Sequence, residues 1–120
     1  MKITICNAFS LNMVDPQFEG YQWNIRPVDP MVIPALLEEG GFESAVGHAD
    51  TAKLFTSLLG VEVPCNRATV GGCRGKLLVG QYSGPRLPEG TTTLPEGAKV
   101  VWWLVEWWTY QDDAMIWRGP

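Results

Sequence analysis

Short runs of alternating apolar and polar residues predict a β-sheet. Residues 21–26, Tyr-Gln-Trp-Asn-Ile-Arg, alternate between large apolar and polar side chains, which is typical of a strand with one buried face. Residues 100–108 are almost continuously apolar and aromatic, as expected for a central strand. Three further strands are predicted over residues 2–9, over residues 61–70 with an interruption around Pro64, and over residues 76–82 after a turn at residues 71–75.

Two segments have the spacing and the end signals of helices. The first begins at Asp29-Pro30, an N-cap followed by proline at the first helical position, and ends near Glu39 before Gly40-Gly41. The second follows His48 and ends at Gly60, where the backbone of a C-terminal cap favours glycine. The apolar face of this second helix is predicted to contain Ala49, Ala52, Leu54, Phe55, Leu58 and Leu59.

Strands interleaved with two helices indicate an α/β fold. We expect a central mixed sheet of about five strands flanked by helices, in a single domain over residues 1–120. The order of the strands does not follow from the pattern. Residues 10–20 are predicted to be a loop, and residues 109–120 a peripheral tail.

The segment 83–99 differs in composition from the rest of the chain. It contains three consecutive threonines and two copies of Leu-Pro-Glu-Gly, at residues 87–90 and 94–97. A loop of this length in a small domain is uncommon and is often a lid or a binding segment. We therefore expect a mobile flap here.

Composition excludes several classes of function. No apolar run approaches the length of about 20 residues that a membrane helix needs, and the N-terminus has no signal-peptide cleavage site, so we expect a cytoplasmic protein without a membrane partner. The net charge of −4 and the lack of a basic block argue against a duplex nucleic acid as partner. A small ligand with few phosphates stays compatible with this charge.

The cysteines and the histidine limit the metal and redox chemistry. Three cysteines, Cys6, Cys65 and Cys73, are an odd number without C-x-x-C spacing, so a disulfide framework is not expected. A chain with one histidine has a poor ligand set for zinc. We expect neither a metal nor a cofactor.

His48 is the first candidate for chemistry. A lone histidine is more often structural or simply exposed, but His48 directly precedes a helix, where free backbone N–H groups and the helix dipole favour an anion. The dipole favours a neutral imidazole, whereas a bound phosphate favours imidazolium. A histidine between these influences can donate or accept a proton near neutral pH.

Arginines, loop carboxylates and tryptophans form a second tier of candidates. Arg67 and Arg86 are either solvated surface residues or bidentate phosphate ligands. Glu89 and Glu96 are candidate general bases or hydrogen-bond acceptors. Alternation places Trp103 and Trp107 on one face of their strand and Trp102 and Trp108 on the other, with core packing or a subunit interface as the expected use.

Several short motifs occur in order between residue 1 and about residue 108. They are Asn7-Ala8-Phe9-Ser10, Asn12-Met13, Gly47-His48 with Thr51, Asn66-Arg67, Gln81 and Arg86-Leu87-x-Glu89-Gly90. Read together, these motifs resemble the viral ring nuclease family, which contains anti-CRISPR proteins directed against type III systems and has bacterial relatives.

The resemblance implies a homodimer that binds cyclic tetra-adenylate across its two-fold axis, beneath loops that close over the ring. Cleavage in this family needs no metal and yields linear di-adenylates that end in a cyclic phosphate. The location implied is the cytoplasm of a prokaryotic cell or of an infected prokaryotic host.

Carried over by position, the resemblance implies a catalytic centre of His48 as general acid, Glu89 as the group that orients or deprotonates the 2′-OH, and Arg86 as the phosphate-stabilising cation. Arg67 is implied to hold the ring. The remaining substrate-binding residues implied are Asn7, Ser10 and Gln81, which would bond to ribose or base.

Two features depart from the motif pattern. Pro88 stiffens the Arg-Leu-x-Glu-Gly segment, and the second Leu-Pro-Glu-Gly copy makes Glu96 a rival to Glu89. Two alternatives to an enzyme stay open: a sponge or sensor that binds cyclic oligoadenylate without cutting it, and a small dimeric interaction protein that uses the Trp-rich strand.

Overall fold

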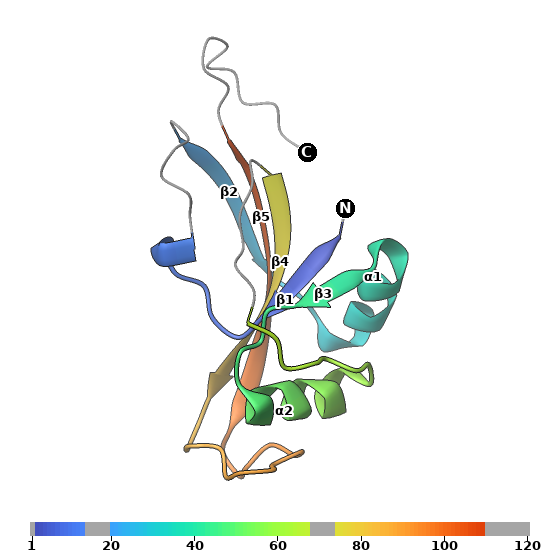
Figure 1. Cartoon of the computed structure of the whole chain (residues 1–120), viewed down its shortest axis with the longest axis vertical. Coiled ribbons are helices and arrows are strands. Elements are labelled where there is room, and N and C mark those ends of the chain that lie inside the picture. The colour runs from blue at the N-terminus through green and yellow to red at the C-terminus, as the bar shows by residue number, and fades with distance from the viewer. Residues whose placement is uncertain (1, 14–19, 68–73, 110–120) are drawn as a thin grey trace.

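A five-stranded mixed sheet with two helices forms the fold of this protein in a computed structural model, which describes residues 2–13, 20–67 and 74–109 (Figure 1). The elements are β1 (Ile3–Cys6), η1 (Leu11–Met13), β2 (Tyr21–Pro27), η2 (Pro30–Val32), α1 (Ile33–Gly40), β3 (Phe42–Ser44), α2 (Ala49–Leu59), β4 (Arg74–Ser83) and β5 (Lys99–Thr109). Within the described ranges, no helix has the length and apolar character needed to cross a membrane.

The strands follow the order β2-β5-β4-β1-β3, so the sheet has one parallel and one antiparallel half. β1 lies parallel to both β3 and β4. β5 lies antiparallel to β2 and β4 and has a neighbour on each side, as predicted for the Trp-rich segment. The expected fold class, a mixed sheet of about five strands with helices in one domain, is confirmed.

Both helices cover the same face of the sheet. Residues of α1 and α2 belong to one buried cluster together with Ile3, Ile5, Leu78 and Trp102, which point from β1, β4 and β5 toward that face. The ring of Phe55 from α2 lies 4.8 Å from the ring of Trp102, centroid to centroid. A Cβ at Gly80 would lie only 2.5 Å from the Phe55 ring and 2.7 Å from Trp102, so the absence of a side chain at Gly80 makes this contact possible.

The opposite face of the sheet has a second, aromatic cluster. It contains Cys6, Leu77, Val79, Val105 and Trp107, with Phe9, Trp23 and Trp103 packed against them. No residue of α1 or α2 belongs to this cluster. Trp103 and Trp107 therefore share a face while Trp102 lies on the other, which confirms that part of the predicted alternation.

The helix ends agree with the sequence signals. The Asp29 carboxylate accepts a hydrogen bond from the N–H of Met31 at 2.9 Å, and the first turn after it is a 3-10 helix that continues into α1. Gly60 ends α2 with φ +72°. Four of the six residues predicted for the apolar face of α2 are buried, but Ala49 and Leu58 are exposed because they lie at the margins of that face.

One predicted strand is absent from the described residues, and one short strand was missed. Residues 61–67 form no strand, and residues 68–73 lie outside the described part of the chain. Side chains form hydrogen bonds with the backbone groups that would pair with a neighbouring strand. The hydroxyl of Thr56 accepts a hydrogen bond from the N–H of Val63 at 2.9 Å, and the hydroxyl of Ser44 donates one to the carbonyl of Pro64 at 2.6 Å. The three-residue strand β3 was not predicted, because a run this short has no visible period.

The contact across Gly80 generates the first prediction. Gly80→Ala inserts a methyl group into a packed core, which typically destabilises a protein by about 1–3 kcal/mol. Urea unfolding should show this loss. In a Phe55→Leu background the added methyl group has more room, so the same substitution should cost less, and an equal cost in both backgrounds would contradict the assigned clash.

Candidate functional site

Three parallel strands place several sequence candidates at one end of the sheet. Cys6, the last residue of β1, pairs with Val79 of β4, and Ile5 pairs with Ser44, the last residue of β3. The chain therefore leaves β1 at Asn7 and leaves β3 toward Gly47 and His48 at the same edge. In α/β sheets, ligands bind beyond this carboxyl edge of parallel strands.

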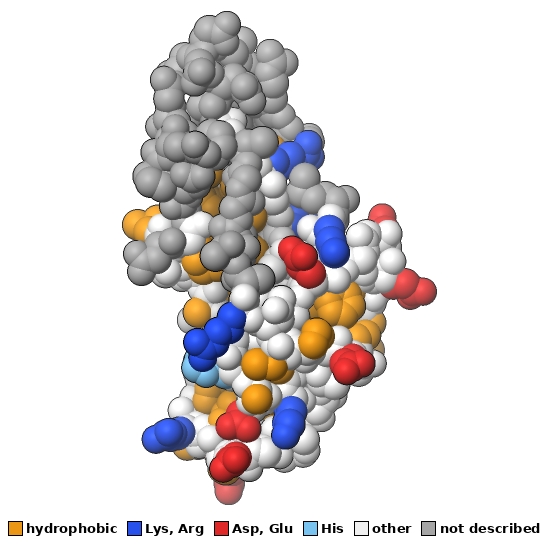
Figure 2. Space-filling view, in the orientation of Figure 1, with side chains coloured by type: hydrophobic (Ala, Val, Ile, Leu, Met, Phe, Trp, Pro, Cys, Tyr) orange, Lys and Arg blue, Asp and Glu red, His pale blue; other side chains and the backbone are white. Residues whose placement is uncertain are grey.

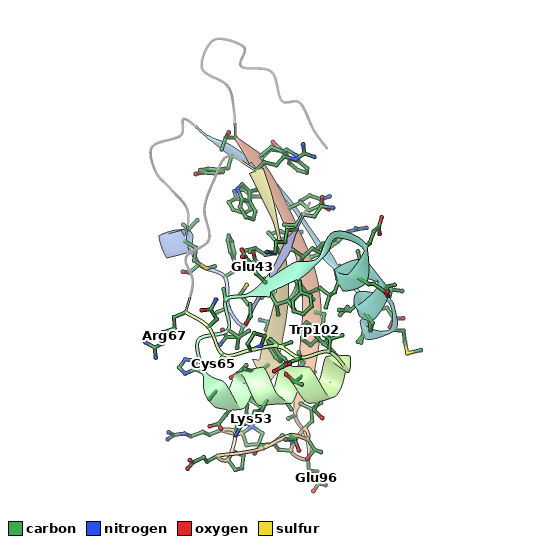
Figure 3. All side chains as sticks on the ribbon, turned by 45° about the vertical axis from the view of Figure 1, so that its right-hand side comes forward. Glu43, Lys53, Cys65, Arg67, Glu96 and Trp102 are labelled. Atoms are coloured by element: carbon green, nitrogen blue, oxygen red, sulfur yellow. The ribbon has the colours of Figure 1, made fainter. Side chains whose placement is uncertain are left out.

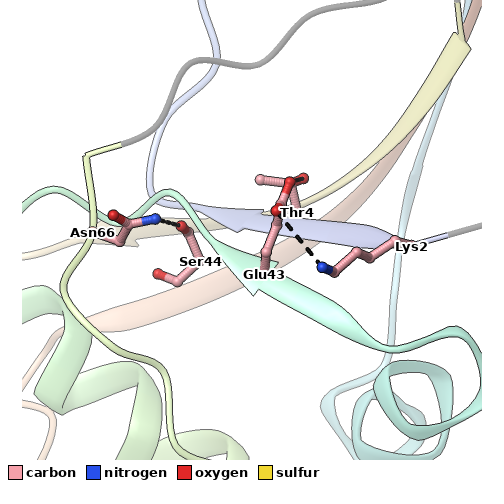
Figure 4. A network of polar contacts seen from close by, with 5 residues as sticks. All are labelled: Lys2, Thr4, Glu43, Ser44 and Asn66. Atoms are coloured by element: carbon pink, nitrogen blue, oxygen red, sulfur yellow. Dashed lines mark hydrogen bonds and ion pairs between the residues drawn. The ribbon is translucent and has the colours of Figure 1, made fainter.

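The buried hydroxyl of Ser44 fixes the segment that leads to His48. It donates to the carbonyl of Pro64 at 2.6 Å and accepts the N–H of Val46 at 3.1 Å. Asn66 adds a hydrogen bond from its side chain to the carbonyl of Ser44 at 2.7 Å, seen in Figure 4. In the same close-up, the carboxylate of Glu43 on β3 accepts a hydrogen bond from the hydroxyl of Thr4 at 3.2 Å. Its Oε2 lies 3.8 Å from Nζ of Lys2, and the two contacts join β3 to the chain at β1.

Arg67 lies against the residue before His48. Its Nε donates to the carbonyl of Gly47 at 3.4 Å, and a Cβ at Gly47 would lie 3.2 Å from its Cγ. The stem of the arginine therefore packs on bare backbone while its guanidinium stays exposed. Figure 3 shows Arg67 beside the end of α2 at which the helix begins.

His48 is the N-cap residue of α2. Its backbone is extended, with φ −117° and ψ 126°, and its carbonyl accepts the N–H of Ala52 at 3.0 Å. Its side chain makes no capping hydrogen bond and is exposed, the pale blue side chain at the surface in Figure 2. The imidazole is thus free to meet a ligand at the positive end of the helix.

The segment that contains Arg86 and Glu89 lies against the first turn of α2. Together with Ala49 and Asp50 it lines a hollow of about 520 Å³, whose other lining residues are Leu87 and Pro88. Because Ala49 directly follows His48, the structure brings Arg86 and Glu89 to the end of the helix where the histidine lies. His48 itself is not among the residues that line this hollow.

The two Leu-Pro-Glu-Gly copies fold as the same turn but lie in different places. In the first, Thr91 N–H bonds to the carbonyl of Pro88 at 3.2 Å, and in the second, Ala98 N–H bonds to the carbonyl of Pro95 at 3.0 Å. Glu96 does not line the hollow beside α2, and in Figure 3 it lies below the far end of that helix. The geometry therefore favours Glu89 over Glu96.

Asn7 and Gln81 meet in a separate hollow on the aromatic face of the sheet. It measures about 420 Å³, and its lining includes Phe9, Ile25 and Trp103. The indole N–H of Trp103 donates to the side-chain oxygen of Gln81 at 3.0 Å, which leaves the amide group of Gln81 free to donate. Core packing or a subunit interface was the use expected of Trp103, and the sequence carries no local signal of this polar contact.

Ser10 lies in neither hollow. Its carbonyl accepts the N–H of Met13 and so begins η1, while its side chain is exposed. The substrate-binding role implied for Ser10 thus has no support from the surroundings of this residue in one chain.

Cys6 borders this end of the sheet but is a poor nucleophile. Burial raises the pKa of its thiol to about 11, which keeps it protonated near neutral pH. Cys65 is exposed, and both cysteines are free. Cys73 lies outside the described residues.

Comparisons with known proteins give a consistent picture. The family model described as STIV B116-like matches residues 3–100. A protein of Sulfolobus islandicus filamentous virus, named "Uncharacterized protein 26", is 39% identical over 83 residues, which are 66% of this chain and 70% of the relative. The solved structure of B116 of Sulfolobus turreted icosahedral virus superposes with a TM-score of 0.70 at 28% identity, over 90% of this chain and 99% of B116.

Proposed function

We propose that this chain, which belongs to the STIV B116-like family, is a metal-independent ring nuclease that cleaves cyclic tetra-adenylate to linear di-adenylates. This activity would switch off type III CRISPR signalling. Relatives in two Sulfolobus viruses are in keeping with such an anti-CRISPR role.

The observation that carries the proposal is the position of the Arg86–Glu89 segment beside the end of α2 that directly follows His48. Arg86 and Glu89 line the hollow that Ala49 and Asp50 complete, and the exposed imidazole of His48 directly precedes Ala49. Cleavage of a phosphodiester by a neighbouring hydroxyl is helped by an acid, a carboxylate and a cation. These three groups are available at this helix N-terminus.

The proposed reaction uses a nucleophile that RNA itself supplies. The ribose 2′-oxygen attacks the adjacent phosphorus, the bond from phosphorus to the 5′-oxygen breaks, and a cyclic phosphate forms. Glu89 orients the 2′-OH and takes its proton, while His48 gives a proton to the departing 5′-oxygen. Arg86 stabilises the charge on the phosphoryl oxygens, and Arg67 holds a neighbouring phosphate.

The second hollow suits the base or the ribose of the ring. Asn7 and Gln81 offer amide groups beside the indole of Trp103, and such amides can hydrogen-bond to the edge of an adenine. An aromatic ring next to them provides a surface on which a base can stack.

In this proposal the active form is a homodimer, because one subunit offers few cationic side chains to a ring of four phosphates. A ring of four phosphates requires more cationic side chains than Arg67 and Arg86 of one subunit provide, and the chain as a whole has a charge of −4. A two-fold dimer would double both arginines and place two His48 side chains opposite the two phosphates to be cut.

Loss of the imidazole tests the reaction. We expect the protein to cleave labelled cyclic tetra-adenylate in EDTA, and His48→Ala to lower the single-turnover rate by about 10²–10⁴-fold, the usual contribution of a general acid. Glu38→Ala, an exposed position on α1, is the control and should cleave normally.

The outcomes of this assay separate the alternatives. If the wild-type protein binds the ring without cleaving it, the result would favour a sponge or sensor. If it does not bind the ring, both the ring nuclease and the sponge or sensor would be refuted. Loss of cleavage in EDTA would refute the metal-free mechanism.

The two glutamates of the repeated motif form a matched pair. Glu89→Gln removes the carboxylate beside Arg86 and should slow cleavage at least about tenfold, because an amide cannot accept the 2′ proton. Glu96→Gln makes the same chemical change in the same type of turn and should leave the rate unchanged. Equal rates for both variants, measured under single turnover, would remove Glu89 from the catalytic centre.

The oligomeric state is directly measurable. Sedimentation equilibrium should give twice the chain mass of 13.3 kDa for the wild-type protein at the concentrations used for cleavage. An active monomer would refute the shared site.

A further inference from the structure

One hydrogen bond ties the loop of residues 84–98 to the helix that begins after His48. The backbone N–H of Gly90 donates to Oδ1 of Asp50 at 3.0 Å, and 40 residues separate the two partners. Within the part of the chain that the structure describes, no other side-chain hydrogen bond joins this loop to α2.

The bond holds a turn whose shape is already defined. The N–H and the hydroxyl of Thr91 both donate to the carbonyl of Pro88, at 3.2 Å and 2.6 Å. Gly90 occupies the third position of this turn with φ +77°, a conformation that favours glycine, and Glu89 occupies the second position. Because Glu89 directly precedes Gly90 in this turn, the side chain that holds Gly90 also restrains the backbone of Glu89.

Asp50 itself has a fixed position relative to the histidine. It is the second residue of α2, two residues after His48, in the first turn of a helix whose ring contact with Trp102 seats it on the sheet. A carboxylate in this turn is also stabilised by the helix dipole.

We propose that Asp50 is a positioning residue, which holds the Arg86–Glu89 segment against the start of α2 so that Glu89 and His48 act on the same phosphodiester. The proposal rests on the ring nuclease activity proposed above. Asp50 touches neither substrate nor reacting atoms in this role; it acts through Gly90.

The second Leu-Pro-Glu-Gly copy provides an internal comparison. Gly97 has φ +80° in the same type of turn, yet no described side chain accepts its N–H. A change at Asp50 should therefore alter Gly90 and leave Gly97 as it was.

Three variants test the role of the acceptor. Asp50→Ala removes it, whereas Asp50→Asn keeps an oxygen at the same place without the charge. Asp29→Ala is the matched control, because it removes an equivalent hydrogen bond, from Met31 N–H to a carboxylate, at the remote start of η2.

We expect Asp50→Ala to lower the single-turnover cleavage rate by about 10- to 100-fold, the usual effect of losing a hydrogen bond to a charged group. Ring affinity, measured in a His48→Ala background, should not fall by more than about threefold, since the Asp50 carboxylate offers the phosphates of the ring no attraction that its loss would remove. Asp50→Asn should restore most of the rate, and Asp29→Ala should cleave normally. Amide hydrogen exchange should accelerate at Gly90 but not at Gly97 in Asp50→Ala.

The results that overturn the proposal differ from those that overturn the function. An inactive wild-type protein would refute the ring nuclease. An active wild-type protein matched in rate by Asp50→Ala, or an Asp50→Asn as slow as Asp50→Ala, would refute the positioning role alone. Unchanged exchange at Gly90 would refute the hydrogen bond itself.

Discussion

The ring of Phe55 lies against Trp102 across the gap that Gly80 leaves in β4, and this contact seats α2 on the sheet. The space above Gly80 is too small even for a methyl group. Few orientations of α2 therefore keep the rings of Phe55 and Trp102 in contact there. Once the helix is seated, its first residues must lie at the carboxyl edge of β1 and β3. The place of His48 is thus a consequence of aromatic packing about two helical turns away from it.

The strands and helices with a clear period could be predicted from the sequence, and the segments held by side chains could not. β5 is recognisable as a long apolar and aromatic run, α2 is long enough to show its helical period, and Gly60 marks the end of the helix. Residues 61–67 have the composition of a strand, but Thr56 and Ser44 bind their backbone instead. Such bonds join distant positions and leave no local pattern in the chain.

The candidate site shows the same division. A histidine before a helix and an Arg-Leu-x-Glu-Gly motif are visible in one sequence, and the structure places the motif against the first turn of that helix. The sequence could not choose between Glu89 and Glu96, since both occur in the same four residues. In the structure Asp50 lies 40 positions from Gly90 and binds only the turn that contains Glu89.

A single site that combines a carboxylate pair with phosphate binding has an electrostatic cost. Asp50 and Glu89 both line the hollow in which we place a phosphate, and like charges within it oppose binding. The bond from Gly90 N–H stabilises one of these carboxylates, and Arg86 and the start of α2 offset the other. One subunit therefore comes close to local neutrality without a surplus of positive charge. A multiply charged ring needs that surplus, and in our proposal it comes from Arg67, which lies outside the hollow against Gly47 and is present twice in a dimer.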